Sequence, residues 1–434
     1  FRLSTMSKEK VVLFWFRRDL RLDDNPGLNA ALETGQKVLP LFIFDPDILK
    51  MFPDAKDKRL SFIYGHLKSI KQSIQEMGGQ LKVFHQPVDE VFKTLLQEFE
   101  VLGLYANEDF EPKNISRDKQ VAELLTNKSI PFSLKPDHYL VRPGEVLKAD
   151  GNPYTVYSPF YKQWAKANKE EPRPLAQGNW WSGEADWLPL EAMGYEYHEN
   201  FFFKPGWKAL EMSNYAEQRD FPAQHGCSQM AVHLRFGTVS VRQLYKHTRH
   251  QSETYVKELA WREFFAHILF HFPEVEQQCF KPQYEQVPWL NEVEKFQLWC
   301  EGKTGYPMVD AGMRELNETG HMHNRVRMVV ASFLCKHLLI DWRWGEAYFA
   351  QKLLDYDLAS NNGNWQWAAG CGCDAAPYFR VFNPSSQQEK FDPKDEYIRT
   401  WVKEYGTADY ADPIVEHKFA RERALNTYKN ALVP

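Results

Sequence analysis

The chain has 434 residues, more than one domain usually contains, so we expect two domains. Its net charge of −5 argues against a uniformly basic nucleic-acid binder, although a local basic face is compatible with it. No apolar run approaches the roughly 18 residues that a membrane-spanning helix needs, so we expect no membrane partner.

The first third of the chain predicts strands that alternate with helices. The apolar runs 11–16 and 38–44 are typical of strands buried on both faces of a sheet. We expect further strands at 81–84, 101–106 and 130–134, and helices from Pro26 and at 60–77, 88–99 and 117–125. This alternation indicates a Rossmann-like, doubly wound parallel sheet over residues 6–135. No GxGxxG follows the first strand and no Walker lysine occurs, so a standard nucleotide fingerprint is absent.

Residues 136–205 break this pattern, because Pro, Gly, Trp and Asn recur there without sustained periodicity. A stretch of this length is unusual inside a compact domain, and it indicates a long connector with short helices. From residue 206 onward the apolar spacing is helical, as at 255–272, 308–316, 326–339 and 346–354. We therefore predict an all-α domain over residues 206–434.

The stretch 353–367 combines two carboxylates, two adjacent amides, two tryptophans and a glycine. Asn, Asp and Gly are unfavourable in a helix interior, so the composition argues against a helix there. It favours a polar cradle for a large aromatic ligand, and a polar loop anchored by a buried Trp is the alternative. Asp355 and Asp357 would need a counter-ion if both were buried, and Arg327 is the obvious one.

Three further clusters in the helical half carry candidate binding groups. Small and hydroxyl residues at 226–231 open a predicted helix, where they could bind a phosphate through backbone N–H groups or simply cap the helix. Glu258, Trp261 and Arg262 fall on neighbouring faces of one predicted helix. They could form the floor of a pocket, or the Glu and Arg could form an intrahelical ion pair beside a Trp in the core. Residues 320–328 hold two Arg, two His, one Asn and two Met, which suits phosphate and base-edge contacts or a solvated basic face.

The six cysteines form no CxxC pair and no framework of the short secreted type. Reduced thiols in a cytoplasm are therefore expected rather than disulfides. Cys371-Gly372-Cys373 lacks a second pair at zinc spacing, so we expect no metal.

Together these clusters resemble the photolyase and cryptochrome family, from Val11 to about Glu404. Further matching motifs are FRRDLR at 16–21, WREF at 261–264, GKTGYP at 302–307 and KFD at 390–392. Within the family, His323-Asn324-Arg325 and the run WQWAA at 365–369 look like class I cyclobutane pyrimidine dimer photolyases. The resemblance implies an α/β antenna domain and a helical domain that binds FAD in a U-shape, active as reduced FADH⁻.

The resemblance also implies which residues hold FAD. By motif they are Tyr215, Cys227, Ser228, Gln229, Met230, Ala231, Tyr255, Arg262, Arg327, Asp355 and Asp357, with Asn361 beside flavin N5. The family usually has Thr-Ser-Arg/Lys-Leu-Ser at the 227–231 turn, so this chain lacks one cation and two hydroxyls there. An Asn amide can serve either a protonated or a deprotonated N5, which suits a flavin that cycles through redox states.

The implied activity is light-driven DNA repair. Trp365, Trp342 and Trp289 match the family's electron-transfer chain, from the flavin to the surface. The residues that match the family's lesion pocket are Glu258, Trp261, Asn324, Met328 and Trp367. Arg219 and Arg325 match its DNA or pocket contacts. The enzyme would flip a pyrimidine dimer out of UV-damaged DNA, wedge it between Trp261 and Trp367, and split it with an electron from photoexcited reduced FAD.

Several features stay open at this level. The antenna chromophore is methenyltetrahydrofolate, a deazaflavin, a second flavin or none, because the Asn-Glu pair typical of folate-binding members is missing at 112–118. A blue-light-sensing cryptochrome and a DASH-type photolyase for single-stranded DNA are the alternative functions. We expect a monomer in a bacterial-type cytoplasm, associated with the nucleoid when bound to DNA.

Overall fold

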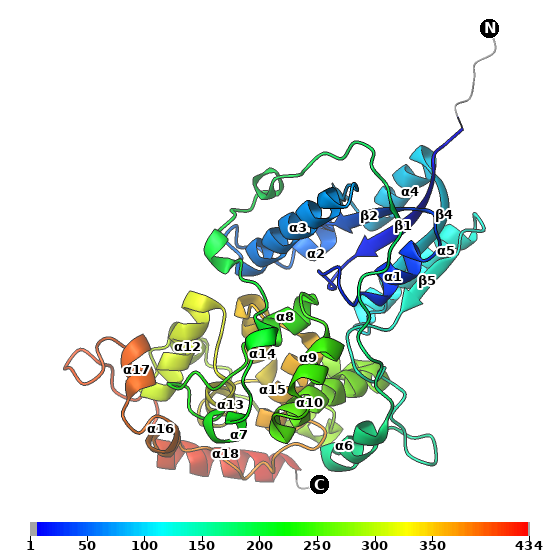
Figure 1. The fold of residues 1–434 in the computed structure, drawn as a ribbon. Helices are drawn as coiled ribbons and strands as arrows, with labels where there is room; N and C mark the ends of the chain where they lie inside the picture. Colours follow the sequence, from blue (N-terminus) through cyan, green and yellow to red (C-terminus); the bar gives the residue numbers. More distant parts are fainter. Residues whose placement is uncertain (1–6, 433–434) are drawn as a thin grey trace. The chain divides into compact units, whose positions relative to one another are not determined.

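The computed structural model describes residues 7–432, which form two compact units (Figure 1). The first unit contains the described residues up to Arg142, then Asn168–Leu210 and Gln229–His247. The second contains Pro143–Ala167, Glu211–Ser228 and the described residues from Thr248 onward. Met6 and residues 433–434, at the ends of the predicted domains, lie outside the described residues. The domain limits 6–135, 136–205 and 206–434 stay a prediction.

The first unit contains the expected parallel sheet. Its strands are β1 (Lys10–Phe16), β2 (Lys37–Ile43), β3 (Lys82–Phe84), β4 (Glu100–Asn107) and β5 (Phe132–Lys135), in the order β3-β2-β1-β4-β5. All neighbouring pairs are parallel, and the order reverses between β1 and β4, which confirms the doubly wound fold. A sixth short strand, β6 (Asn179–Trp180), pairs with β2 from within the predicted connector, where the aperiodic sequence indicated no strand.

The first unit also contains helices. They are α1 (Pro26–Leu32), α2 (Pro46–Leu49), α3 (Lys58–Glu76), α4 (Val88–Glu98), α5 (Pro112–Thr126), α8 (Ala231–Phe236) and α9 (Val241–Thr248), with 3-10 turns η1 (Leu190–Met193), η2 (Glu199–Phe201) and η3 (Trp207–Ala209). Alternate residues of β1, namely Val11, Leu13 and Trp15, are buried against α4 and α5. Both faces of β1 and β2 are buried after the first residue, as their continuous apolar runs predicted.

A buried ion-pair cluster joins α9 to the strand ends of the first unit. Arg242 donates from Nε to Asp24 Oδ2 at 2.8 Å and from Nη2 to Asp137 Oδ1 at 2.7 Å. The Arg21 guanidinium also binds Asp137. Removing one partner of such a buried pair typically costs about 3–5 kcal/mol, because the other charge is left uncompensated. This cluster is a physical reason why residues 229–247 fold with the α/β unit.

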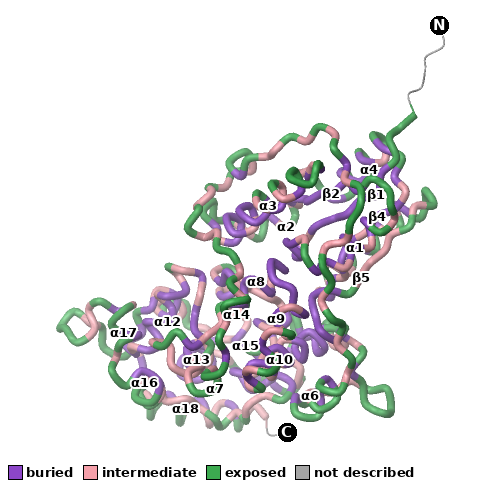
Figure 2. The backbone as a smooth tube through the Cα atoms, in the orientation of Figure 1, coloured by how far each residue is buried: buried purple, intermediate pink, exposed green. Residues whose placement is uncertain are grey.

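Among residues 7–432, all six strands lie in the first unit, and the second unit is built from helices (Figure 1). Both buried and exposed residues occur along its backbone (Figure 2). Its elements are α6 (Tyr157–Lys166), α7 (Tyr215–Gln218), α10 (Glu253–His271), η4 (Pro273–Glu276), η5 (Pro282–Gln286), α11 (Val293–Glu301), α12 (Pro307–Thr319), α13 (Asn324–Ser332), the π-helical turn η6 (Phe333–His337), α14 (Trp342–Lys352), α15 (Leu358–Ala369), α16 (Pro384–Phe391), α17 (Glu396–Trp401) and α18 (His417–Leu432). Across residues 7–432, no helix combines the length and apolar character that crossing a membrane requires.

One expectation was wrong, because most of the stretch 353–367 is helical. It forms α15, which begins after Asp357, whose carboxylate accepts from the Ser360 N–H at 3.0 Å. Gly363 has a packing reason to be there, since a Cβ on it would lie 2.1 Å from a ring carbon of Phe265 on α10. Close packing of α10 on α15 therefore outweighs the weak helix propensity of these residues.

Buried amides supply the second reason for this helix. Asn362 and Gln366 lie one turn apart on α15, and both donate to the backbone carbonyl of Val275, at 2.8 and 2.9 Å. Gln366 also donates to the Gln278 carbonyl at 3.0 Å. The polar side chains that looked unsuited to a helix thus satisfy backbone carbonyls of the distant segment that follows α10.

Candidate functional site

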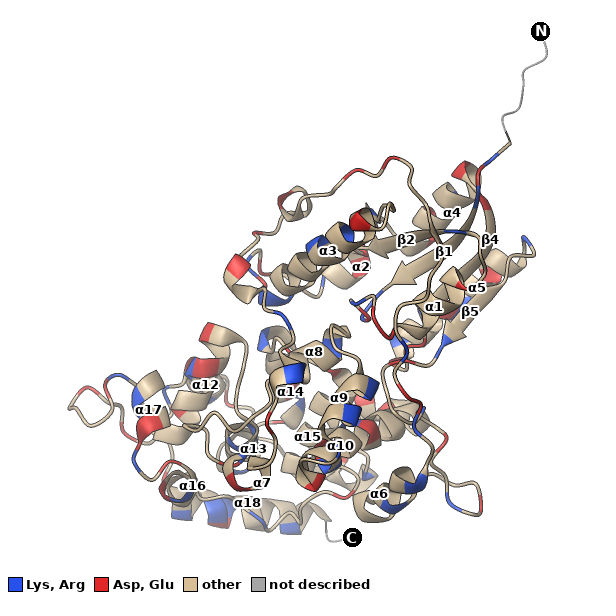
Figure 3. Ribbon diagram, viewed as in Figure 1, with Lys and Arg blue, Asp and Glu red and all other residues tan. Residues whose placement is uncertain are grey.

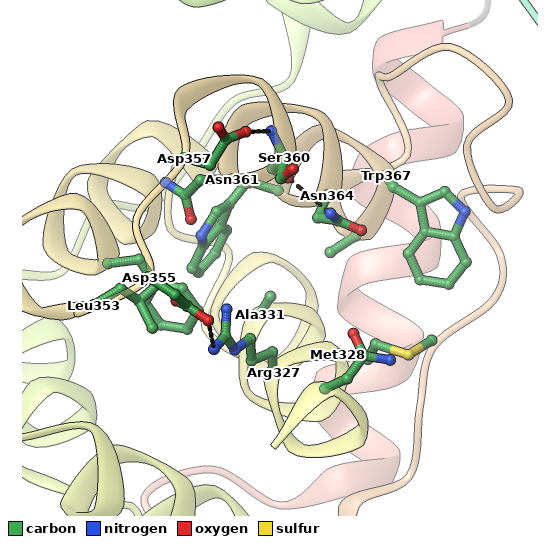
Figure 4. A pocket seen from close by; sticks show the side chains of 14 residues that line it. Arg327, Met328, Ala331, Leu353, Asp355, Asp357, Ser360, Asn361, Asn364 and Trp367 are labelled. Carbon is green, nitrogen blue, oxygen red and sulfur yellow. Dashed lines mark hydrogen bonds and ion pairs between the residues drawn. The ribbon is translucent and has the colours of Figure 1, made fainter. Parts of the chain in front are cut away.

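A hollow in the second unit lies among α13, α14 and α15, and it encloses about 600 Å³, part of it open to solvent (Figure 4). Eight of the residues singled out in the sequence line it: Asn324, Arg327, Met328, Asp355, Asp357, Asn361, Trp365 and Trp367. Residues separated by more than one helix in the chain therefore converge on one site. Four of the six remaining lining residues are apolar, which is typical of a site that binds a small molecule or cofactor.

The expected counter-ion pair is present at this hollow. Arg327 donates from Nη2 to Asp355 Oδ2 at 2.8 Å and from Nε to the Met322 carbonyl at 2.7 Å. Asp357 instead caps α15, so the two carboxylates have different roles. The second oxygen of Asp355, Oδ1, is buried and accepts no hydrogen bond from any described residue. A buried carboxylate oxygen without a donor is costly, so it marks a place where a ligand's N–H or O–H group fits.

Asn361 presents a second acceptor at the same hollow. Its Nδ2 donates to the Glu346 backbone oxygen at 3.1 Å and to Glu346 Oε1 at 2.9 Å. Within the described residues, nothing donates to Asn361 Oδ1, and the residue lines the hollow (Figure 4). Burial raises the pKa of the Glu346 carboxyl, while the hydrogen bond from Asn361 lowers it. The sequence analysis did not single out Glu346, because a lone Glu on a helix carries no signal of its own.

Tyr255 on α10 contacts two residues that precede this helix in the chain, Tyr215 and Ser228. The Tyr255 hydroxyl donates to Ser228 Oγ at 3.0 Å, and the Tyr215 ring meets Tyr255 edge-on at 5.2 Å. Burial raises the pKa of Tyr255 to about 12, so its hydroxyl stays a donor at neutral pH. Three residues of the predicted turn, Gln229, Met230 and Ala231, fold with the first unit, and Gln229 has a positive φ of 57°.

Two predicted DNA contacts are engaged in ion pairs. Arg219 donates from Nη1 to Glu258 Oε1 at 2.5 Å. Glu258 therefore pairs with a residue 39 positions earlier in the sequence rather than with a neighbour on its own helix. Burial lowers the pKa of Arg219, but the Glu258 carboxylate raises it above its ordinary value. Arg325 donates to Asp220 Oδ1 at 2.8 Å. Each pair reduces the net positive charge that the arginine offers to a phosphate.

Trp261 is held by a residue that sequence reasoning missed. The Tyr157 ring lies parallel to the Trp261 ring, 3.7 Å away at an interplanar angle of 5°. The Tyr157 hydroxyl donates to the Lys257 carbonyl at 2.8 Å, which fixes the ring on α10. A signal was present in the aromatic residues 157, 160, 161 and 164, whose spacing is helical within the predicted connector.

The three tryptophans of the predicted electron chain differ in burial. Trp365 and Trp342 are 2% and 1% exposed, and Trp289 is half-buried against the same core. Trp365 meets Phe349 at 4.9 Å and Trp299 at 6.1 Å, both edge-on. The Trp342 indole nitrogen is buried and donates to no group in residues 7–432. Trp299 was not singled out in the sequence, because a Trp in an amphipathic helix is usually core packing.

Comparisons with known proteins agree with the motifs. Residues 255–408 match the FAD binding domain of DNA photolyase, and residues 12–177 match the DNA photolyase model. A deoxyribodipyrimidine photo-lyase from Synechococcus is 36% identical over 96% of this chain and 96% of its own. A class III photolyase from Agrobacterium tumefaciens superposes with a TM-score of 0.88 at 32% identity, covering 99% of both chains. An archaeal photolyase from Sulfolobus tokodaii with two FAD molecules superposes with a TM-score of 0.87 at 35% identity, covering 97% of this chain and 100% of its own.

Proposed function

The chain belongs to the photolyase and cryptochrome family, and we propose that it is a deoxyribodipyrimidine photo-lyase that uses light and FAD to repair UV-damaged DNA. The observation that carries this function is the hollow lined by Arg327, Asp355, Asn361 and Trp365, which lies within the match to an FAD binding domain. It places buried acceptors, a cation and an oxidisable indole around one space.

The residues of the hollow suit FAD. Asp355 Oδ1 and Asn361 Oδ1 are acceptors that no described residue satisfies, and flavin carries N–H groups that can donate to them. Arg327 holds Asp355 in place through its ion pair and adds positive charge near a reduced, anionic flavin. We assign the same role of cofactor binding to Tyr215, Cys227, Ser228, Tyr255, Arg262 and Asp357. Reduced FAD, when bound, supplies an electron after it absorbs blue light.

We assign Trp365, Trp342 and Trp289 to electron supply. Trp365 lines the hollow and Trp342 is buried in the core beside it, where water cannot react with an oxidised ring. Trp289 is half-buried, so it is the member that an external reductant reaches first. Exchange of electrons through these rings would keep the cofactor reduced between repair cycles.

The lesion pocket is assigned to Trp261, Trp367, Asn324, Met328 and Glu258. Trp367, Asn324 and Met328 line the hollow, so a flipped-out dimer entering there meets an indole, an amide and a thioether. Base stacking on such aromatic rings contributes about 1–3 kcal/mol per base. The Glu258 carboxylate accepts from a pyrimidine N–H, and Arg219 holds it in position.

A DNA-binding face on this protein would be local, since Lys and Arg are mixed with Asp and Glu along the helices and form no uniformly basic surface in the ribbon view (Figure 3). We assign Arg219 and Arg325 to this face. We also propose that the protein works as a monomer in a bacterial-type cytoplasm, at the nucleoid when it is bound to DNA. The antenna chromophore is to be identified by extraction from the purified protein, with a folate, a deazaflavin and a second flavin as candidates.

The deciding experiment is light-dependent repair. Photoreduced protein is mixed with duplex DNA that carries one cyclobutane thymine dimer, in blue light and in the dark. We expect restored thymines only in the light. Glu258→Ala should lower repair at least about ten-fold, since a charge-assisted hydrogen bond is lost. Glu253→Ala, which changes an exposed Glu on the same helix, is the matched control.

Two outcomes would point elsewhere. Photoreduction of bound FAD without repair of this dimer or of a (6-4) product would refute the repair function and favour a blue-light receptor. Repair confined to single-stranded substrate would favour the DASH-type alternative.

A further inference from the structure

Another hollow of the second unit lies beside Trp289, between the end of η5 and α18. It encloses about 860 Å³, including space open to solvent. One wall contains Pro288, which directly precedes Trp289, and the other contains Thr427, which directly precedes Tyr428. The Tyr428 ring meets the Trp289 ring edge-on at 5.9 Å, so both walls adjoin this half-buried indole.

The walls of this hollow are polar. Gln286, Asn426 and Asn430 line it with amides, Thr427 adds a hydroxyl, and Arg423 adds a cation. Among the described residues that line it, none is acidic. Amides and hydroxyls both donate and accept hydrogen bonds, so they suit the hydroxyl groups of a small molecule.

The charge of Arg423 is not compensated within residues 7–432. Nη2 donates to the His337 carbonyl at 2.6 Å, and Nε is buried without an acceptor. Burial lowers the pKa of Arg423, while the charge of Glu292 raises it. The Glu292 carboxylate, however, pairs with Lys295 at 3.0 Å. A half-buried cation without a counter-ion is unfavourable, so an anion in the hollow would be stabilised.

We propose that this hollow binds a small, hydroxylated anion that donates one electron to Trp289, namely an anionic enediol of the ascorbate type. The inference rests on the proposed role of Trp289 as the outermost tryptophan of the electron supply. It goes beyond that role, because it gives the external reductant a binding site and names the chemistry that the site selects.

The transfer balances in charge and in atoms. Once Trp289 has passed an electron inward, its indole is a radical cation. The enediol monoanion gives one electron to this ring, which restores neutral Trp289, and releases its remaining enediol proton to solvent as it becomes a radical anion. The reductant carries one negative charge before and after the step, so Arg423 stabilises both forms.

A bound donor also reacts differently from one that meets the indole by collision. Binding holds the donor beside the ring, so the transfer becomes a step within one complex. The rate at which Trp289 is restored should therefore level off at high reductant concentration. Reaction by collision would instead give a rate that rises in proportion to concentration.

The test follows decay of the Trp289 radical after a laser flash in FAD-loaded protein, with increasing ascorbate. Arg423→Gln should raise the half-saturating concentration about ten-fold, because a charge-assisted hydrogen bond is lost. Arg423→Lys keeps the charge and should recover most of this loss. Arg421→Gln removes an exposed arginine of α18 that does not line the hollow, so it is the matched control and should behave as the wild type.

Dithiothreitol serves as the second probe, because it is hydroxylated and reducing but largely uncharged at neutral pH. Its rate should rise in proportion to concentration and be equal in the wild type and Arg423→Gln. Equal slowing of both reductants in Arg423→Gln would show a changed exposure of Trp289 and would overturn the binding site.

Binding in the dark does not depend on the electron chain. Calorimetric titration of the FAD-loaded protein with ascorbate, without oxygen, should show one site that Arg423→Gln weakens about ten-fold. Asn430→Ala removes only an exposed amide of the hollow and should weaken it about two- to five-fold. No dark binding, or a wild-type rate proportional to ascorbate, would overturn the inference and leave the role of Trp289 intact. No Trp289 radical after the flash would refute the electron chain, and the inference with it.

Discussion

A methyl group added at Gly345 tests how closely α14 packs on the pocket tryptophan. A Cβ there would lie 2.1 Å from Cη2 and 2.4 Å from Cζ3 of Trp365, and 2.6 Å from Leu334 Cδ2. Contacts this short cannot be kept, and both neighbours are buried, so either the helix or the indole must move.

The magnitude follows from two opposing effects. Overpacking a well-packed core costs about 1–3 kcal/mol, and three short contacts place Gly345→Ala at the upper end. Replacing Gly by Ala inside a helix contributes about 1 kcal/mol in the other direction. We therefore expect a net loss of about 2 kcal/mol in the free energy of unfolding. Gly206→Ala is the control, because no atom lies within 4 Å of its Cβ and its φ is −77°.

Urea unfolding followed by circular dichroism measures the loss, and a double-mutant cycle identifies its cause. In a Trp365→Phe background the two closest ring atoms are absent, so Gly345→Ala should cost about 1 kcal/mol less than in the wild type. Photoreduction of FAD should also slow in Gly345→Ala if Trp365 is displaced. A stability equal to that of the wild type, or additive effects in the cycle, would refute this packing argument.

Three further predictions concern substrate binding and pH. Tyr157→Ala should weaken dark binding of dimer-containing DNA about two- to ten-fold, because the aromatic pair that orders Trp261 is lost. Tyr157→Phe keeps the stacked ring and should bind normally. Equal binding by both variants in a filter or fluorescence assay would contradict this role. Arg325→Ala should reduce the slope of log K against log salt by about one, and an unchanged slope would mean that Arg325 stays bound to Asp220 rather than to phosphate. Burial lowers the pKa of His267 to about 4. Between about pH 6.5 and pH 4 the unfolded chain therefore binds a proton that the folded chain does not, and stability falls as pH falls through this window. His267→Gln should flatten that part of the stability profile measured by urea unfolding.

The architecture could be predicted from short-range patterns. Continuous apolar runs marked β1 and β2, because strands covered on both faces need no polar side. Helical spacing marked α10 and α12 to within a few residues. The strand β6 could not be found in this way, since two residues are too few to show a period.

Residue identities and motifs also predicted the main members of the site. The pairing of Arg327 with Asp355 followed from the rule that a buried carboxylate needs a counter-ion, and it is confirmed. The tryptophan roles and the other site assignments came from the resemblance, and they stay predictions.

Tertiary structure alone decided the features that depend on what lies opposite a side chain. The composition of 358–369 argued against a helix, but Gly363 fits the ring of Phe265 and Asn362 satisfies a distant carbonyl, so packing overrides propensity. The stack of Tyr157 on Trp261 joins residues about a hundred positions apart, which no local pattern reports. The orientation of the Asn361 amide is set by two oxygens of Glu346. A sequence determines which donors and acceptors exist, and only the fold determines which of them face each other and which remain for a ligand.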